Sequence, residues 1–124
     1  MSVQINNYLV LGVCLDYKEF KKHISDWRGI SIDDVDDDFL YPYQDSAYKG
    51  INHHNGLCVI SDGMGGEYVV VGEVLEKSEE GQGFTCKPIV CKAGKKKKLK
   101  IETLLKEHFN LLVDVNLYVF THYR

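Results

Sequence analysis

The sequence predicts an α+β domain in which a mainly antiparallel sheet of about five strands carries two helices on one face. Short β-rich runs are separated by turn residues, and two stretches show the three- and four-residue spacing of an amphipathic helix. The length of 124 residues suits one hydrophobic core. We therefore expect residues 1–124 to form a single domain.

The first strand is expected at residues 8–15, an apolar run with two β-branched valines. A helix should follow directly, because Asp16 and Glu19 have the spacing of a capping box and Gly29 is a typical helix end. One face of this helix is apolar, with residues at spacings of three, four and three: Tyr17, Phe20, Ile24 and Trp27.

No periodicity persists from residue 31 to residue 55, which predicts a long irregular loop. Five of the 18 acidic residues fall within residues 33–38, and three aromatic residues follow. Carboxylates can steer an encounter with a basic surface while aromatic rings supply buried contact area. The predicted partner-binding residues are Asp33, Asp34, Asp36, Asp37, Asp38, Phe39, Tyr41 and Tyr43. Two simpler interpretations are a solvated acidic loop and aromatic rings that fix the loop to the body of the domain.

Two β-rich runs, residues 57–60 and 68–75, flank the glycine-rich segment 61–66 and predict a hairpin. Three consecutive valines from Val69 indicate a strand that is covered on both faces and central in the sheet. A further strand is expected at residues 84–91, where Pro88 favours an edge position. These strands complete the middle of the expected sheet.

The second helix is expected from about Lys100 to Asn110, without a good N-cap, and the lysines before it are expected to form an exposed tip or connection. Alternating apolar residues then predict a last strand at residues 112–121. The element order is therefore strand, helix, loop, three strands, helix, strand.

The charge balance of 15 basic and 18 acidic residues gives a net charge of −3, without the basic excess of a nucleic-acid-binding protein. Only two residues are arginine, which argues against specific DNA recognition. A lysine run can still contact phosphates through charge. The alternative small-molecule hypothesis is a nucleotide-binding protein that uses Gly63, Gly65, Gly66, Lys95, Lys96, Lys97 and Lys98.

The string from Asp62 to Gly66, DGMGG, resembles the metal-binding motif of PPM-type protein phosphatases. This resemblance implies that Asp62 would bridge two divalent metals in a metal-dependent phosphoesterase. The likeness is limited to these five residues, and a valine-rich strand follows where that family has a helix. A hairpin turn is therefore the favoured interpretation, and no metal or cofactor is expected.

The four cysteines, Cys14, Cys58, Cys86 and Cys91, are expected to be free thiols, two of them in strands, in a cytoplasmic protein. The first residues lack the features of a signal peptide, and no apolar run has the length of a membrane span. No membrane partner is expected. A zinc site at His53, His54 and Cys58 is not favoured, because neighbours on an extended chain point to opposite sides.

Residues 56–77 (GLCVISDGMGGEYVVVGEVLEK) and 41–48 (YPYQDSAY) resemble small accessory proteins of large tailed bacteriophages. The resemblance implies a host-takeover or anti-defence factor that acts by stoichiometric binding, and it supplies no catalytic motif. The leading hypothesis is a non-enzymatic protein-binding factor, an inhibitor of a host or defence protein. Self-association as a homodimer is left open by the sequence.

Overall fold

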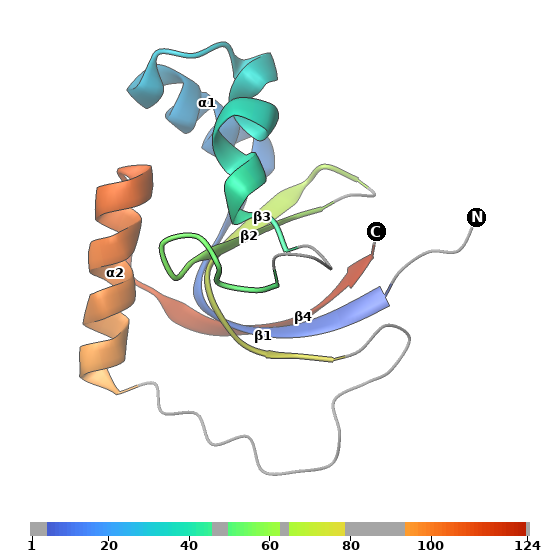
Figure 1. The fold of residues 1–124 in the computed structure, drawn as a ribbon, viewed down its shortest axis with the longest axis vertical. Helices are drawn as coiled ribbons and strands as arrows, with labels where there is room; N and C mark the ends of the chain where they lie inside the picture. Colours follow the sequence, from blue (N-terminus) through green and yellow to red (C-terminus); the bar gives the residue numbers. More distant parts are fainter. Residues whose placement is uncertain (1–4, 46–49, 63–64, 79–93, 124) are drawn as a thin grey trace.

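The computed structural model describes residues 5–45, 50–62, 65–78 and 94–123 and contains one antiparallel sheet (Figure 1). The strand order is β2-β3-β1-β4, so β3 is central as its valines predicted. The strands are β1 (Ile5–Asp16), β2 (Cys58–Ser61), β3 (Tyr68–Lys77) and β4 (Asn116–Tyr123). This arrangement confirms the α+β prediction with an antiparallel sheet, in which the described residues form four strands. The further strand expected at residues 84–91 lies outside the described residues.

Each face of the sheet carries its own apolar cluster, because side chains alternate along the strands. On one face, Leu11 and Val13 of β1 and Val71 of β3 pack with both α-helices, α1 (Tyr17–Arg28) and α2 (Lys95–Phe109). The opposite face buries Tyr8, Val10, Cys58, Ile60, Val70 and Val74. The sheet is strongly curled, and β1 and β3 both bend along their length (Figure 1). The prediction of two helices on one face is consistent with the first cluster.

Helix α1 begins and ends where the sequence predicted. The Asp16 side chain accepts a hydrogen bond from the Glu19 backbone N–H at 2.9 Å. Gly29 closes the helix in a left-handed conformation with φ of 67°. A glycine adopts this conformation without the steric strain that a Cβ would cause. The apolar stripe then directs Phe20 and Ile24 into the core.

Helix α2 begins earlier than expected, because residues 95–98 form its first turn. The prediction of an exposed tip or connection there is therefore wrong. Lysine is a good helix former, and the carbonyl of Gly94 accepts hydrogen bonds from the N–H groups of Lys97 and Lys98. The missing side-chain cap was predicted correctly, since Gly94 is the N-cap. Strand β4 is shifted to residues 116–123.

The prediction of an irregular loop is wrong for residues 32–43, which form three short helical turns in succession. A 3-10 turn (Ile32–Asp34) leads into a π-helix (Val35–Leu40) and a second 3-10 turn (Tyr41–Tyr43). The change from 3-10 to π and back to 3-10 geometry gives no constant period, which is why the sequence pattern failed here. We call residues 32–43 the acidic excursion.

Candidate functional site

The acidic excursion is anchored to the core on its inner side. Val35 and Leu40 are fully buried, and they share the inward side because the π-helical turn is wider than an α-helical one. The i→i+5 pattern is seen where the Tyr41 N–H donates to the Asp36 carbonyl. π-Helical turns are rare and are often found at functional sites.

Asp36 contacts helix α1. Its carboxylate accepts a short hydrogen bond from the Tyr17 hydroxyl, and the Lys21 ammonium lies 3.8 Å from its other oxygen. Burial, followed by this hydrogen bond, raises the pKa of Tyr17 to about 12. Asp36 thus helps to attach the excursion to α1, while its side chain remains 38% exposed.

The outer side of the acidic excursion is charged and partly apolar. Asp33, Asp34, Asp37 and Asp38 are all exposed. Two large apolar side chains lie among them, Ile32 at 43% exposure and Tyr41 at 58%. Four carboxylates and two apolar side chains therefore share a segment whose backbone is held in place from behind.

Two of the predicted contact aromatics pack against the core. Tyr43 is only 5% exposed, and its ring centroid lies 4.7 Å from that of Phe109 in α2. Phe39 is half-buried, with Phe109 at 5.6 Å and Trp27 of α1 at 6.0 Å. These rings fix the excursion between the two helices, which was the simpler interpretation of the sequence. Of the three aromatics, only Tyr41 is well exposed.

A cleft of about 320 Å³ opens beside the excursion, between the C-terminal ends of α1 and α2. Its polar lining comes from Arg28, Asp38, His54, Glu107 and His108. The Arg28 guanidinium lies over the Trp27 ring at 5.4 Å and over the Phe39 ring at 5.6 Å. Since Asp38 also belongs to the exposed acidic surface, the cleft continues that surface. Sequence reasoning missed this group because it joins segments far apart in the chain.

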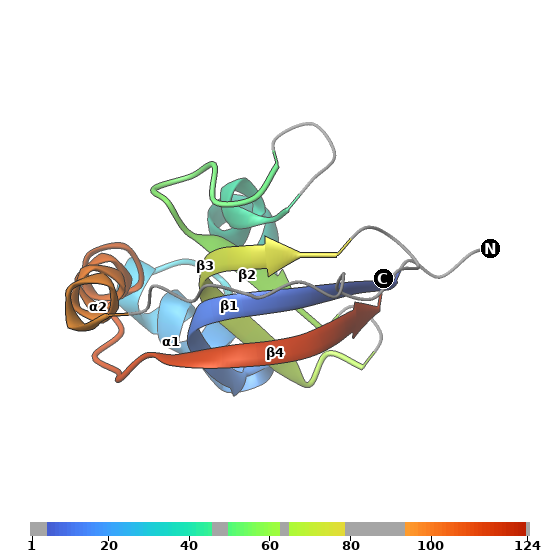
Figure 2. The ribbon, with the colours of Figure 1, turned by 90° about the horizontal axis from the view of Figure 1, so that it is seen from below.

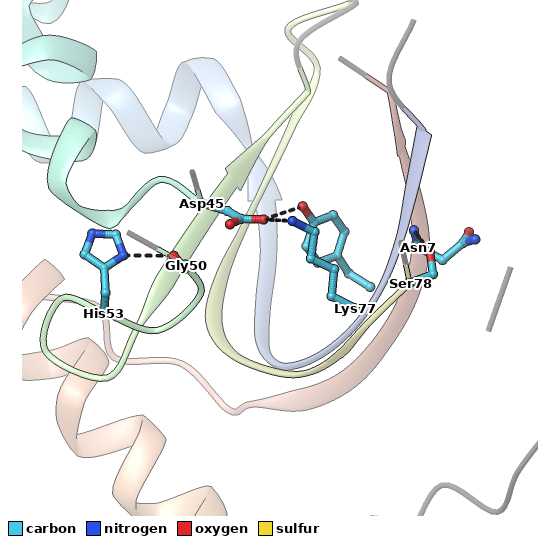
Figure 3. A network of polar contacts seen from close by, with 7 residues as sticks. Asn7, Asp45, Gly50, His53, Lys77 and Ser78 are labelled. Atoms are coloured by element: carbon cyan, nitrogen blue, oxygen red, sulfur yellow. Dashed lines mark hydrogen bonds and ion pairs between the residues drawn. The ribbon is translucent and has the colours of Figure 1, made fainter. Parts of the chain in front are cut away.

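The chain after the excursion is fixed by a buried carboxylate (Figure 3). The Asp45 side chain, 2% exposed, accepts hydrogen bonds from the Tyr8 hydroxyl at 2.9 Å and from the Lys77 ammonium. These contacts connect residue 45 to β1 and β3. Figure 3 also shows Asn7 with Ser78, and His53 with the Gly50 carbonyl at 3.0 Å.

Asn52 provides a second attachment, at the β-bulge opposite Leu9 and Val10. Its side-chain amide donates to the Val74 carbonyl at 2.8 Å and accepts from the Val74 N–H at 2.9 Å. The amide thus replaces a neighbouring strand for one residue of β3. Together with Asp45, it fixes both ends of the connection to the sheet.

Asp62 forms a turn, as the favoured interpretation predicted. Its carboxylate accepts hydrogen bonds from the N–H groups of Gly65 at 3.1 Å and Glu67 at 3.2 Å. Gly66 has φ of 65°, which favours glycine. Burial and the nearby Asp62 charge raise the pKa of Tyr68. Among the described residues, no group of three or more His, Cys, Asp or Glu is placed to hold a metal ion.

The residues of the alternative nucleotide site are not brought together. Lys95, Lys96, Lys97 and Lys98 begin α2, whereas Gly65 and Gly66 lie in the β2–β3 turn. These two places are well separated in both views (Figures 1 and 2). Lys97 also lies 3.4 Å from the Glu73 carboxylate. Gly63 lies outside the described residues.

Cys14 in β1 is an exposed free thiol and Cys58 in β2 a buried one, as expected for these two residues. Cys86 and Cys91 lie outside the described residues.

Within the described part of the chain, neither α-helix has the length and apolar character needed to cross a membrane. Comparison with protein-family models, with curated proteins and with solved structures finds no match to this chain.

Proposed function

We propose that this protein is a non-enzymatic binding factor whose acidic excursion docks on a basic surface of another protein. The supporting observation is the exposure of Ile32 and Tyr41 among four carboxylates on a segment that is anchored from behind. Exposed carboxylates increase the rate of encounter with a basic partner. The two apolar side chains then supply contact area that is removed from water.

The anchoring of the excursion favours tight binding by this surface. Val35 and Leu40 are fully buried, and Asp36 is held by α1. A surface that is already ordered loses less conformational entropy when a partner binds. The adjoining cleft, with Asp38 on its rim, offers a recess for a side chain of the partner.

We further propose that the partner is a host or defence protein and that the complex is inhibitory and forms in the cytoplasm. This part of the proposal rests on the resemblance of residues 56–77 and 41–48 to accessory proteins of tailed bacteriophages. The resembling segment 56–77 contains β2 and β3, which form the scaffold of the sheet. The binding residues are therefore assigned from the surface of the excursion.

Affinity capture with two charge-matched variants tests the proposed surface. The first variant changes Asp33, Asp34, Asp37 and Asp38 to Asn. The control changes four exposed acidic residues elsewhere to their amides: Glu19, Asp26, Glu67 and Asp114. Both variants move the net charge from −3 to +1, because −3 plus 4 is +1. Bacterial lysate is passed over each immobilised protein, and the bound proteins are identified by mass spectrometry.

A protein that binds the wild type and the control but not the first variant supports the proposal. We also expect Tyr41→Ala to weaken binding of that purified protein by about tenfold or more, as for an interface hot spot. Equal loss in both charge variants would show that only net charge matters. If both charge variants still bind the protein as well as the wild type does, the excursion is not part of the binding surface.

A further inference from the structure

Strand β4 forms one edge of the sheet in the described part of the chain, and its own sequence carries none of the residues that usually protect an edge strand. Its residues pair with β1, and no described strand lies on its other side. Natural edge strands are commonly shielded by lysine, proline, a bulge or a covering loop. Asn116–Tyr123 contains no acidic residue, no Lys, no Arg and no Pro. Among the described residues, no strand pairs with the outward backbone groups of this edge, which can therefore accept another strand.

The opposite edge of the sheet is different. Strand β2 has only four residues, and Gln44 forms a parallel bridge with its Val59. The short length and this bridge limit the room for another strand. Pairing between sheets is therefore favoured at β4.

Two apolar side chains of β4 are exposed on the helix-bearing face of the sheet. Leu117 is opposite Leu11, and Val119 is opposite Leu9, so both point to that face. They remain 45% and 68% exposed. In Figure 2 the ends of β1 and β4 near the chain termini extend beyond α2.

We propose that a second copy of this chain pairs with β4 in antiparallel orientation, about a two-fold axis near Val119. The absence of charge favours this occupant, because an antiparallel pair of identical strands brings like side chains close together. In this register Val119 lies opposite its own copy, and Leu117 lies opposite Thr121 of the copy. Two four-stranded sheets would then form one continuous sheet across the dimer.

The dimer would leave the acidic excursion free. Figures 1 and 2 show the excursion well separated from β4, so the two sets of carboxylates would not meet at the dimer interface. The inference is therefore independent of the proposed function. Failure of either proposal leaves the other in place.

Light scattering during size-exclusion chromatography tests the dimer over a wide range of protein concentrations. We expect the wild type to approach twice the single-chain mass of 14.2 kDa at high concentration. Val119→Lys should remain at the single-chain mass, because it places two ammonium groups opposite each other. Ile32→Lys makes the same chemical change on the excursion and should dimerise like the wild type. Circular dichroism checks that each variant is folded.

Cross-linking tests the register directly. In the proposed pair the Cα atoms of the two Val119 residues lie within the range that a disulfide can span. Mild oxidation of Val119→Cys should therefore give a covalent dimer in larger yield than oxidation of the wild type or of Ile32→Cys. A single-chain mass for the wild type overturns the proposal and leaves β4 as an edge for a strand of another protein. A dimer that persists in Val119→Lys, or that gives no added cross-link in Val119→Cys, also overturns it.

Discussion

Gly12 of β1 and Gly72 of β3 lie directly opposite each other, and the two backbones approach so closely that neither position has room for a side chain. A Cβ at Gly12 would lie 2.1 Å from the Val71 carbonyl oxygen, and one at Gly72 would lie 2.3 Å from the Leu11 carbonyl oxygen. Both glycines lie within strands that bend along their length (Figure 1). The pair allows the sheet to curl, since glycine permits close backbone approach within a strand.

We therefore expect Gly12→Ala to lower the free energy of unfolding by about 3 kcal/mol or more, because the added methyl group meets a backbone atom that cannot rotate away. Gly94→Ala is the matched control, since a Cβ there meets nothing within 4 Å. The control should cost at most about 1 kcal/mol, the usual range for a change at a helix N-cap. Urea unfolding monitored by circular dichroism measures both variants, and equal losses would contradict the close-approach argument.

The Tyr17–Asp36 contact predicts a loss of stability at alkaline pH. The pKa of Tyr17 is raised from an ordinary value of 10.0 to about 12 in the folded chain. Because the pKa is raised on folding, Tyr17 contributes to the free energy of unfolding. This contribution is fully present below pH 10 and is lost as the pH rises toward 12. The stability difference between wild type and Tyr17→Phe should be constant near neutral pH and should change in favour of Tyr17→Phe above pH 10. A constant difference throughout urea titrations at increasing pH would contradict the assignment.

The buried Asp45 carboxylate accepts hydrogen bonds from Tyr8 and Lys77, so we expect its replacement to destabilise the fold. Asp45→Asn should lower the free energy of unfolding by about 2 kcal/mol, less than for a fully buried pair since Lys77 is partly exposed. Asp33→Asn removes the same charge from an exposed position and should change stability by no more than about 0.5 kcal/mol. A double-mutant cycle with Lys77→Met separates the ion pair from the Tyr8 hydrogen bond. Additive losses would show that Asp45 and Lys77 are not coupled.

Local signals in the sequence were sufficient to predict α1, the β2–β3 hairpin and the central position of β3. The Asp16 cap and the Gly29 end are set by neighbouring residues, and so is the Asp62 turn. Interactions of this kind depend on short-range geometry that residue type largely determines. The antiparallel α+β class follows from the order of these elements.

The anchors of the candidate site could not be predicted, because each one joins residues far apart in the sequence. Asp45 meets Lys77, and Tyr43 packs on Phe109. The acidic run correctly marked an exposed surface, but composition could not distinguish the exposed Asp37 from Asp36, which contacts Tyr17 and Lys21 of α1. That distinction depends on the π-helical turn, which has no periodic signature in a window of six residues.

The positive charges of the lysines at the start of α2 oppose the helix dipole. The N-terminal end of a helix carries partial positive charge, so the lysines of its first turn are unfavourable there. Lys96→Glu should raise the free energy of unfolding by about 0.5–1 kcal/mol, because it reverses this interaction and adds an attraction to Lys100 one turn later. Lys106→Glu makes the same substitution in the last turn and should destabilise by a similar amount. The change in the free energy of unfolding should be smaller at high salt for both variants, since exposed charges are screened. Shifts of the same sign in the two variants would indicate that net charge, and not the helix dipole, controls the stability of α2.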